Sequence, residues 1–130
     1  MAGAQFAALQ NHKYISLATF RKNGQEVRTP VWFAGEPPQG VPEKLYVYST
    51  ADSGKAKRIR NSGHVRVAPC DMRGKLLGDW IEARAEVVNG QEAQNGMRLL
   101  NTKYFPWKQI LGFFALFSSQ KRVVFVIRPA

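Results

Sequence analysis

The sequence predicts a mainly β protein in which six antiparallel strands surround one core as a small barrel. Six runs are rich in aromatic and β-branched residues, the types favoured in strands. They span 12–20, 25–34, 44–50, 64–71, 79–88 and 121–130. An Asn-Gly pair at 23–24 separates the first two runs and favours a tight hairpin turn. In the fifth run, apolar and charged residues alternate from Ile81 to Glu86, which is typical of an antiparallel strand with one buried face.

Short helices are expected beside these strands. Phe6 and Leu9, three residues apart in an alanine-rich segment, predict a short amphipathic helix at the start of the chain. Another helix is expected within the stretch 49–63, with Ala56 and Ile59 facing the core. Either Asp52 or Ser53 is suited to cap it.

The pattern of 90–105 is also helical, although Gly96 disfavours a helix at that point. The apolar segment 106–120 begins with a proline and predicts a further helix or an irregular lid. Pro30 lies inside the second run, so that strand is expected at an edge, with a bulge, or without a partner at that position. The segment 35–43, with three prolines, is expected to be a loop.

Composition indicates one folded domain over residues 1–130. Hydrophobic residues make up 45% of the 130-residue chain, which is enough for a core and argues against disorder. The formal net charge of +10 predicts an anionic partner: nucleic acid, a membrane surface or a phosphorylated small molecule. The N-terminus lacks the pattern of a signal peptide, and the apolar run 110–117 is too short to span a bilayer, so a cytoplasmic protein is expected.

The sequence contains no recognisable catalytic or metal-binding constellation. Cys70 is the single cysteine and is interpreted as a packing residue. His12 and His64 lie at strand starts and are interpreted as structural. No His/Cys cluster has metal-ligand spacing, so no metal is predicted. If the protein is an enzyme, a bound cofactor is expected to carry the chemistry.

The stretch "STADSGKAKRIRNSG" over 49–63 is the first candidate binding site. A helix that starts here offers unpaired N–H groups and the positive end of its dipole, and Lys55, Lys57 and Arg58 add full charges. Together with the Thr50 and Ser53 hydroxyls, these groups suit a phosphate. The alternative is a solvated basic helix, which the sequence alone leaves equally open. The spacing does not match a Walker loop.

Two further segments are weaker candidates. In "RTPVWF" (28–33), Pro30 exposes the backbone groups of its neighbours, and a flat heterocycle can bind to them. An edge strand with ordinary core aromatics also explains the same residues. In "APCDMRG" (68–74), Pro69 ends a strand, and Asp71 and Arg73 flank a turn that is equally well only a loop.

Taken together and in this order, these motifs resemble those of the pyridoxamine 5′-phosphate oxidase-like proteins, and most closely their subgroup that depends on the deazaflavin coenzyme F420. The resemblance covers roughly residues 10 to 90 and rests on "TPVW", "SGKAKRIR" and "VRVAPCDMRG" as a set. It implies a mainly β, six-stranded antiparallel split β-barrel with short flanking α-helices. It also implies a homodimer that binds coenzyme F420 (an 8-hydroxy-5-deazaflavin) or FMN at its interface and transfers hydride to an organic substrate.

The resemblance also implies which residues hold the cofactor. The phosphate is expected on Lys55, Lys57 and Arg58, with Ser49, Thr50 and Ala51 beside it. The ring is expected along Thr29, Pro30, Val31 and Trp32. The segment Ala68, Pro69, Cys70 and Asp71 is expected to approach from the barrel wall or from the partner. No catalytic residue is implied.

Two other functions stay open at this point. One is a carrier that binds the cofactor without turnover, since no acid/base pair is present. The other is a basic nucleic-acid-binding module, in which Tyr14, Trp32 and Trp80 would stack on bases. It is disfavoured because the chain has no recognition motif and its cations are dispersed.

Overall fold

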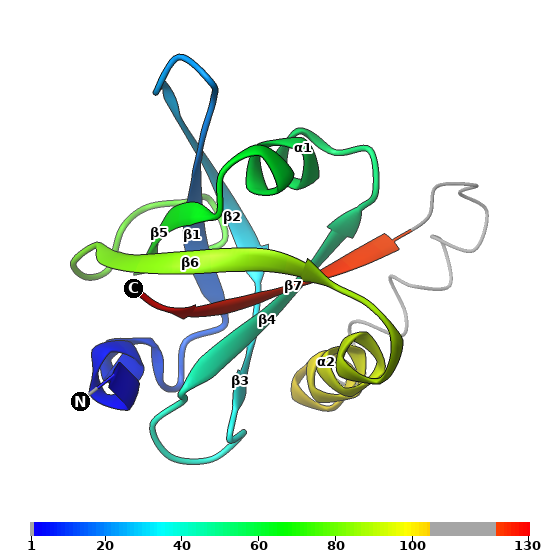
Figure 1. The fold of residues 1–130 in the computed structure, drawn as a ribbon. Helices are drawn as coiled ribbons and strands as arrows, with labels where there is room; N and C mark the ends of the chain where they lie inside the picture. Colours follow the sequence, from blue (N-terminus) through cyan, green and yellow to red (C-terminus); the bar gives the residue numbers. More distant parts are fainter. Residues whose placement is uncertain (1, 105–121) are drawn as a thin grey trace.

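The computed structural model describes residues 2–104 and 122–130. The predicted helix or lid over 106–120 lies outside the described residues. The described chain forms one antiparallel sheet of seven strands with three short helices (Figure 1). The strands are β1 (Tyr14–Phe20), β2 (Glu26–Trp32), β3 (Ala34–Glu36), β4 (Lys44–Thr50), β5 (His64–Cys70), β6 (Ile81–Val88) and β7 (Arg122–Pro129). The helices are the 3-10 helix η1 (Ala2–Leu9) and the α-helices α1 (Gly54–Asn61) and α2 (Gly90–Lys103).

The sheet order, β2-β1-β5-β6-β7-β4-β3, explains why the sheet curls into a half-barrel. β2 and β3 are consecutive in the chain, yet they form opposite edges of the sheet. Only Phe33 separates them, so the two edges must come close together at this point. Phe33 itself is buried in the core. The split-barrel fold expected from the resemblance is therefore confirmed.

β3 is the strand that the sequence did not predict. The run 25–34 was expected to be one strand and 35–43 a loop, but the strand is interrupted at Phe33 and resumes as Ala34–Glu36. β3 pairs with β4, with Gly35 opposite Leu45. A three-residue strand is too short for a detectable alternation, and here it depends on the barrel closure that brings β4 alongside.

The predicted edge position of Pro30 is confirmed. β2 pairs only with β1 among the described strands, so the missing N–H of Pro30 costs no hydrogen bond to a second neighbour. The predicted hairpin turn is also present. Gly24 adopts a positive φ of 88° and donates its N–H to the Arg21 carbonyl over 2.8 Å.

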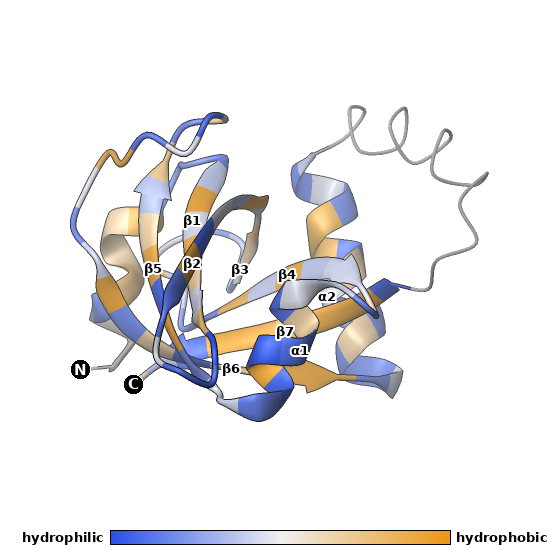
Figure 2. Cartoon of the chain, turned by 90° about the horizontal axis from the view of Figure 1, so that it is seen from above, coloured by the Kyte–Doolittle hydropathy of each residue, from blue (hydrophilic) through white to orange (hydrophobic). Residues whose placement is uncertain are grey.

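The core has two parts, on the two faces of the sheet. β7 contributes to both. Phe125 and Ile127 lie in the barrel interior, whereas Val124 and Val126 pack under α2. Accordingly β7 is coloured hydrophobic along most of its length (Figure 2). η1 adds Phe6 and Leu9 to the interior, and these are fully buried. The spacing of three that predicted a helix suits a 3-10 turn, in which residues i and i+3 eclipse.

α1 closes one end of the barrel. Ala56 and Ile59 are buried in the interior cluster, as their spacing predicted. Of the cations on this helix, Lys57 and Arg60 are exposed, whereas Lys55 and Arg58 are half-buried.

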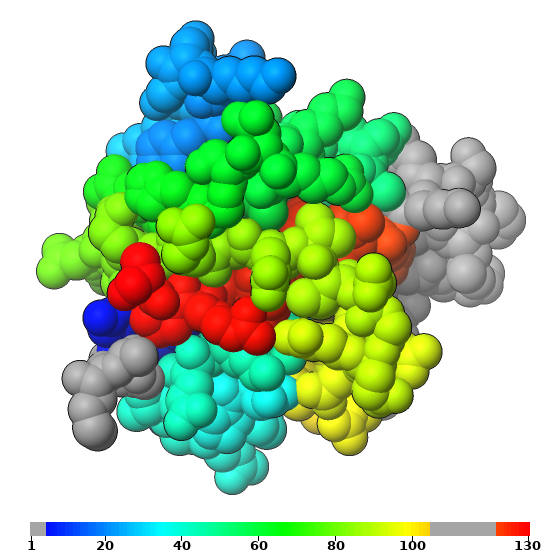
Figure 3. Space-filling view, viewed as in Figure 1, coloured from blue at the N-terminus to red at the C-terminus, as the bar shows by residue number. Residues whose placement is uncertain are grey.

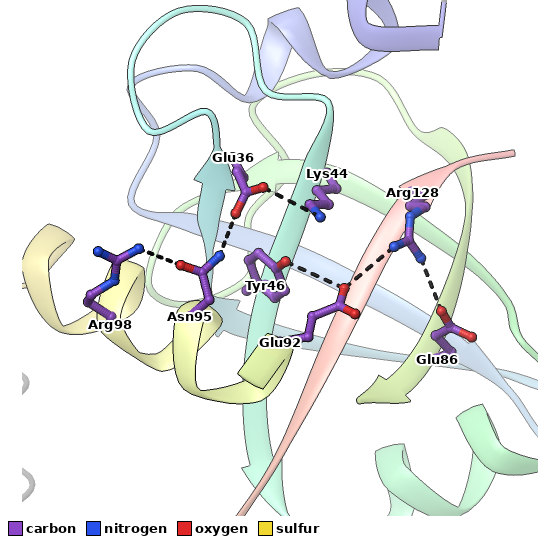
Figure 4. A network of polar contacts seen from close by, with 8 residues as sticks. All are labelled: Glu36, Lys44, Tyr46, Glu86, Glu92, Asn95, Arg98 and Arg128. Carbon is purple, nitrogen blue, oxygen red and sulfur yellow. Dashed lines mark hydrogen bonds and ion pairs between the residues drawn. The ribbon is translucent and has the colours of Figure 1, made fainter. Parts of the chain in front are cut away.

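α2 packs on the outside of β4 and β7 and is fixed there by close contact and by polar groups. At Gly96, a Cβ atom would lie 2.6 Å from Cδ1 of the buried Tyr46 ring, so only glycine permits this approach. Around this contact, side chains of α2 bind the neighbouring strands (Figure 4). Asn95 donates to Glu36 over 2.7 Å, and Glu92 lies 3.5 Å from both the Tyr46 hydroxyl and an Arg128 nitrogen. The glycine that disfavoured a helix in the sequence is thus a packing requirement.

Candidate functional site

The N-terminus of α1 is organised by serine side chains. Ser53 Oγ accepts a hydrogen bond from the Ala56 N–H over 3.1 Å and caps the helix, as predicted. Ser49, near the end of β4, donates to Ser53 Oγ over 3.0 Å, and the Ser53 N–H donates to the Thr50 carbonyl. The strand end and the helix start therefore form one connected turn, which presents the positive end of the helix dipole.

Arg58 is held beside this helix start. Its Nε donates to Thr19 Oγ1 over 2.6 Å, so the guanidinium is anchored to the end of β1. The guanidinium also folds back over Gly54, where Nη1 lies 2.6 Å from the position that a Cβ would take. The glycine of the "SGK" motif thus makes room for the arginine.

Lys55 is half-buried. Burial lowers the pKa of Lys55, and the nearby charge of Arg58 lowers it further. Burial likewise lowers the pKa of Arg58, and Arg21 adds to the effect. The three cations therefore repel one another in a partly desolvated place.

Within residues 2–104 and 122–130, the cations Arg21, Lys22, Lys55 and Lys57 form no ion pair with a carboxylate. The ion pairs of the described residues join other groups, and Asp52, exposed in the turn before α1, forms none of them. Glu26, for example, binds both Arg28 (3.1 Å) and Arg66 (3.4 Å). A group of partly buried, unneutralised cations is a favourable place for an anion, because an anionic ligand supplies the missing opposite charge.

A hollow of about 320 Å³ lies between α1 and the β1–β2 hairpin. Lys55 is not part of its lining. Figure 3 shows the tip of this hairpin beside α1 at one end of the molecule. The lining residues are Phe20, Arg21, Lys22, Gly54, Lys57, Arg58 and Asn61. We call this the basic hollow. Its lining includes four cations and no carboxylate, so its charge favours a phosphate.

Not every cation of α1 takes part. Arg60 is exposed and donates to the Ala51 carbonyl over 3.0 Å, which ties the end of the helix to the preceding turn. Arg60 does not line the basic hollow. Lys57, also exposed, does line it. Substitutions of Lys57 and Arg60 can therefore separate the effect of a contact in the basic hollow from the effect of the helix's overall charge.

The second and third predicted segments lie on either side of β1, at matching positions. Ser16 pairs with Pro30 of β2 and with Ala68 of β5. Tyr14 likewise pairs with Trp32 and with Cys70. Segments 30–32 and 68–70 are thus two strands apart and in register, about 10 Å from each other at the usual strand spacing.

Their side chains divide between the two faces of the sheet. Val31 belongs to the interior core, together with its partner Ile15. Pro30 is exposed, and Trp32 is half-buried on the outer face, where its ring stacks on Tyr104 at a centroid distance of 4.7 Å. The outer side of β2 therefore offers Pro30 and one part of Trp32 to a ligand. Val31 packs in the core and does not face this outer side. Thr29, which pairs with Leu17, is half-buried.

The third segment leads into a rigid turn. Asp71 accepts hydrogen bonds at Oδ1 from the Arg73 and Lys75 N–H groups, each over 2.9 Å. These backbone donors, that of Lys75 above all, hold the pKa of Asp71 below its ordinary value. Cys70 is 2% exposed, and burial raises the pKa of its thiol. This agrees with a packing role and disfavours a reactive thiolate.

Of the first segment's predicted residues, Lys57 and Arg58 line the basic hollow, whereas Ser49, Thr50, Ala51 and Lys55 do not. The other two segments lie at a distance along the sheet. Thr19, which anchors Arg58, lies three residues beyond Ser16 on β1, or about 10 Å at the usual rise per residue. The predicted phosphate and ring positions are therefore separated along β1 and lie at the barrel end and on the outer face, respectively.

Sequence reasoning missed the hairpin side of the basic hollow. Arg21 and Lys22 belong to the turn that the Asn-Gly pair predicts, and Thr19 belongs to the first predicted strand. The available signal was the continuation of the first strand into two adjacent cations, but their position opposite α1 depends on the tertiary fold.

The curled sheet and the basic helix at its end define a protein of the split-barrel class. The family model described as pyridoxamine 5′-phosphate oxidase matches residues 1–130. The chain belongs to this family, as its motifs predicted. No curated protein matches the chain.

Solved structures share the fold at low sequence identity. A conserved hypothetical protein from Mycobacterium tuberculosis is 23% identical, with a TM-score of 0.68 over 99% of this chain and 81% of that one. A protein described as F420 reductase is 22% identical, with a TM-score of 0.58 over 95% of this chain and 90% of that one. The heme storage protein HutZ from Vibrio cholerae is 14% identical, with a TM-score of 0.64 over 93% and 84%, respectively. At these identities the likeness concerns the fold alone.

Among the described residues, no helix has the length and apolar character needed to cross a membrane.

Proposed function

We propose that the protein is an oxidoreductase that binds coenzyme F420 or FMN through the cofactor phosphate and transfers hydride to an organic substrate. The observation that carries this proposal is the basic hollow. Lys57 and Arg58 line it, the half-buried Lys55 lies beside Arg58, and none of these cations has a carboxylate partner in the described ranges. The residues fit a phosphate in charge and in the size of the space.

The roles of the residues follow from this arrangement. Arg58 is positioned by Thr19 and Gly54, so it presents its charge without reorganisation when the anion binds. Lys55 and Lys57 contribute charge, and the turn at Ser49, Thr50 and Ala51 borders the helix start. The exposed Pro30 and the half-buried Trp32 form an apolar surface against which a flat ring can lie. When bound, the deazaflavin or flavin ring supplies the hydride chemistry.

The separation of the two predicted regions supports this assignment. Thr19, which anchors Arg58, lies about 10 Å along β1 from Ser16. Ser16 is the residue that pairs with both Pro30 and Ala68, and the three form one row across the sheet. In a flavin-type molecule a five-carbon chain separates phosphate from ring, which is a comparable length. The segment Ala68–Asp71 borders the same row from the other side of β1.

A homodimer is part of this proposal. The turn after β5 exposes Met72 (67%) and Leu77 (54%), which are large apolar side chains beside the third segment. Exposed apolar residues grouped near a binding site are typical of an interaction surface. Light scattering is expected to give the dimer mass, and Leu77→Asp to shift the protein toward monomer. A monomeric wild-type protein at micromolar concentration would remove this part of the proposal.

The test of the cofactor site uses two variants that remove the same charge from the same helix. Lys57→Gln alters the basic hollow, whereas Arg60→Gln leaves its lining unchanged. We expect F420 or FMN to titrate the wild-type protein, and Lys57→Gln to weaken the binding about tenfold or more, as expected for one charge-assisted contact. Arg60→Gln is expected to stay within about threefold, because it leaves the lining of the basic hollow intact and removes only general charge and one exposed hydrogen bond to the Ala51 carbonyl. Equal losses in both variants would show that binding depends on net charge and not on this site.

Activity requires its own experiment, because a carrier would bind the cofactor equally well. The protein with reduced cofactor is mixed with a panel of quinones and enones, and oxidation of the cofactor is followed by absorbance. Turnover supports an oxidoreductase. Tight binding without turnover supports the carrier. Binding of heme in place of either flavin-type compound would contradict the proposed cofactor.

A further inference from the structure

A second pocket lies away from the basic hollow, between η1, the β3–β4 loop and the end of α2. It has a volume of about 520 Å³, within the range of ligand sites, about 300–1,000 Å³. Its lining includes Leu9, Phe33, Gly35, Pro42, Thr102 and Lys103. None of these residues belongs to the predicted cofactor site. We call it the Lys103 pocket.

The walls of this pocket are mostly apolar and are held in shape by the backbone. Three prolines contribute to them, and proline fixes its own φ. Gly35 packs so closely on Pro42 that a Cβ on the glycine would lie 2.7 Å from Pro42 Cβ. The space is therefore preformed, so a ligand need not order the loop when it binds.

Lys103 is the one charged residue among the described residues that line the pocket. Its Nζ donates to the Phe33 carbonyl over 2.8 Å and lies 3.5 Å from the centroid of the Phe33 ring. No carboxylate pairs with it among the described residues. Desolvation lowers the pKa of the Lys103 ammonium to about 8, which agrees with a cation that lacks an opposite charge.

We propose that the Lys103 pocket binds a small, largely apolar carboxylate, with the carboxylate on Lys103 Nζ and the hydrocarbon part against the proline and leucine walls. The ammonium has three donor hydrogens, and the Phe33 carbonyl accepts only one of them. The Phe33 and Tyr104 rings face the ammonium as well, at 3.5 and 5.3 Å, which leaves one donor for an anion. A cationic ligand is disfavoured because the described lining contains no acid. A wholly polar ligand is disfavoured because it would leave the apolar walls unmatched.

The test compares three eight-carbon probes, namely octanoate, octanamide and octylamine, by calorimetric titration of the full chain without cofactor. Octanoate is expected to bind saturably, octanamide about tenfold or more weakly, and octylamine more weakly still, because only octanoate makes a charge-assisted bond with Lys103. Amide resonances of Phe33 and Thr102 are expected to shift with octanoate, which locates the site.

Variants decide whether Lys103 is responsible. Lys103→Met is expected to reduce octanoate affinity about tenfold or more while leaving octanamide affinity within about threefold, and Lys103→Arg is expected to restore most of the octanoate affinity. Lys75→Met, at an exposed turn outside the pocket, serves as the control for loss of one charge and is expected to bind like wild type. The proposal is overturned if octanoate does not bind the wild type, if octylamine binds as tightly, or if Lys103→Met and Lys75→Met behave alike. Because no cofactor is present, this result is independent of the proposed oxidoreductase activity.

Discussion

Arg58 lies folded over Gly54, with Nη1 2.6 Å from the position of a Cβ at residue 54. Gly54 does not have a positive φ, so alanine is compatible with its backbone. We expect Gly54→Ala to leave stability close to that of wild type, because the helix propensity gained at this first residue of α1 is offset by the loss of the Arg58–Thr19 hydrogen bond. It should nevertheless displace the guanidinium from Thr19 and weaken cofactor binding several-fold. Urea unfolding and cofactor titration measure the two effects, and a variant that binds like wild type would show that the position of Arg58 is unimportant.

Lys55 is expected to oppose folding while it supports binding. Burial and the neighbouring Arg58 lower its pKa, so the folded protein disfavours the charged form. Lys55→Met removes this unfavourable charge and keeps the apolar stem. We expect its free energy of unfolding at pH 7 to equal or exceed that of wild type, and its cofactor affinity to fall about tenfold or more. Lower stability together with unchanged affinity would reverse the assigned role.

Gly96 is expected to be the glycine at which alanine is most harmful. A Cβ at 96 would lie 2.6 Å from Cδ1 and 2.8 Å from Cγ of the fully buried Tyr46. Overpacking of this kind costs about 1–3 kcal/mol, and the better helix propensity of alanine offsets only part of it. Urea unfolding should show the loss for Gly96→Ala. Gln94→Ala, at an exposed position of the same helix, is the control and should be near neutral.

Lys103 predicts a stability difference that depends on pH. Its folded pKa of about 8 is lower than its ordinary value of 10.5, so the unfolded chain binds more protons between these two values. The penalty for the charged lysine is complete below pH 8 and disappears as the pH rises toward 10.5. Wild type should therefore gain stability relative to Lys103→Met between pH 7 and pH 10.

The expected gain is on the order of 1 kcal/mol, since the residue as a whole remains exposed and solvent screens the charge. Urea unfolding of both proteins at several pH values measures the difference between their free energies of unfolding. The contributions of the other titrating groups cancel in this difference. A difference that is constant with pH would contradict the lowered pKa.

The strands were predictable because their signals are local. The alternation from Ile81 to Glu86, the turn at Asn23-Gly24 and the edge proline Pro30 each act within a few residues, and each prediction is confirmed. β3 was missed because its three residues form a strand only when barrel closure brings β4 beside them.

The site was predictable only in part for the same reason. The helix start, its cap at Ser53 and the inward side of Ala56 and Ile59 follow from spacing. The half-burial of Lys55 does not follow from spacing, because it depends on tertiary packing around the helix. Arg21 and Lys22 also face α1 only in the folded barrel. The cofactor assignment of the "TPVW" and "APCD" segments stays a prediction, although the register across β1 places them opposite each other.

The central claim, that the basic hollow binds the phosphate of a flavin-type cofactor, is tested most directly by removing that phosphate from the ligand. Coenzyme F420 and FMN are titrated into the protein beside the phosphate-free deazaflavin and riboflavin, which keep the same rings. We predict that at least one phosphorylated compound binds, and that its phosphate-free counterpart binds about tenfold or more weakly. Equal affinity for the two members of each pair, or no binding of either phosphorylated compound, would contradict the claim.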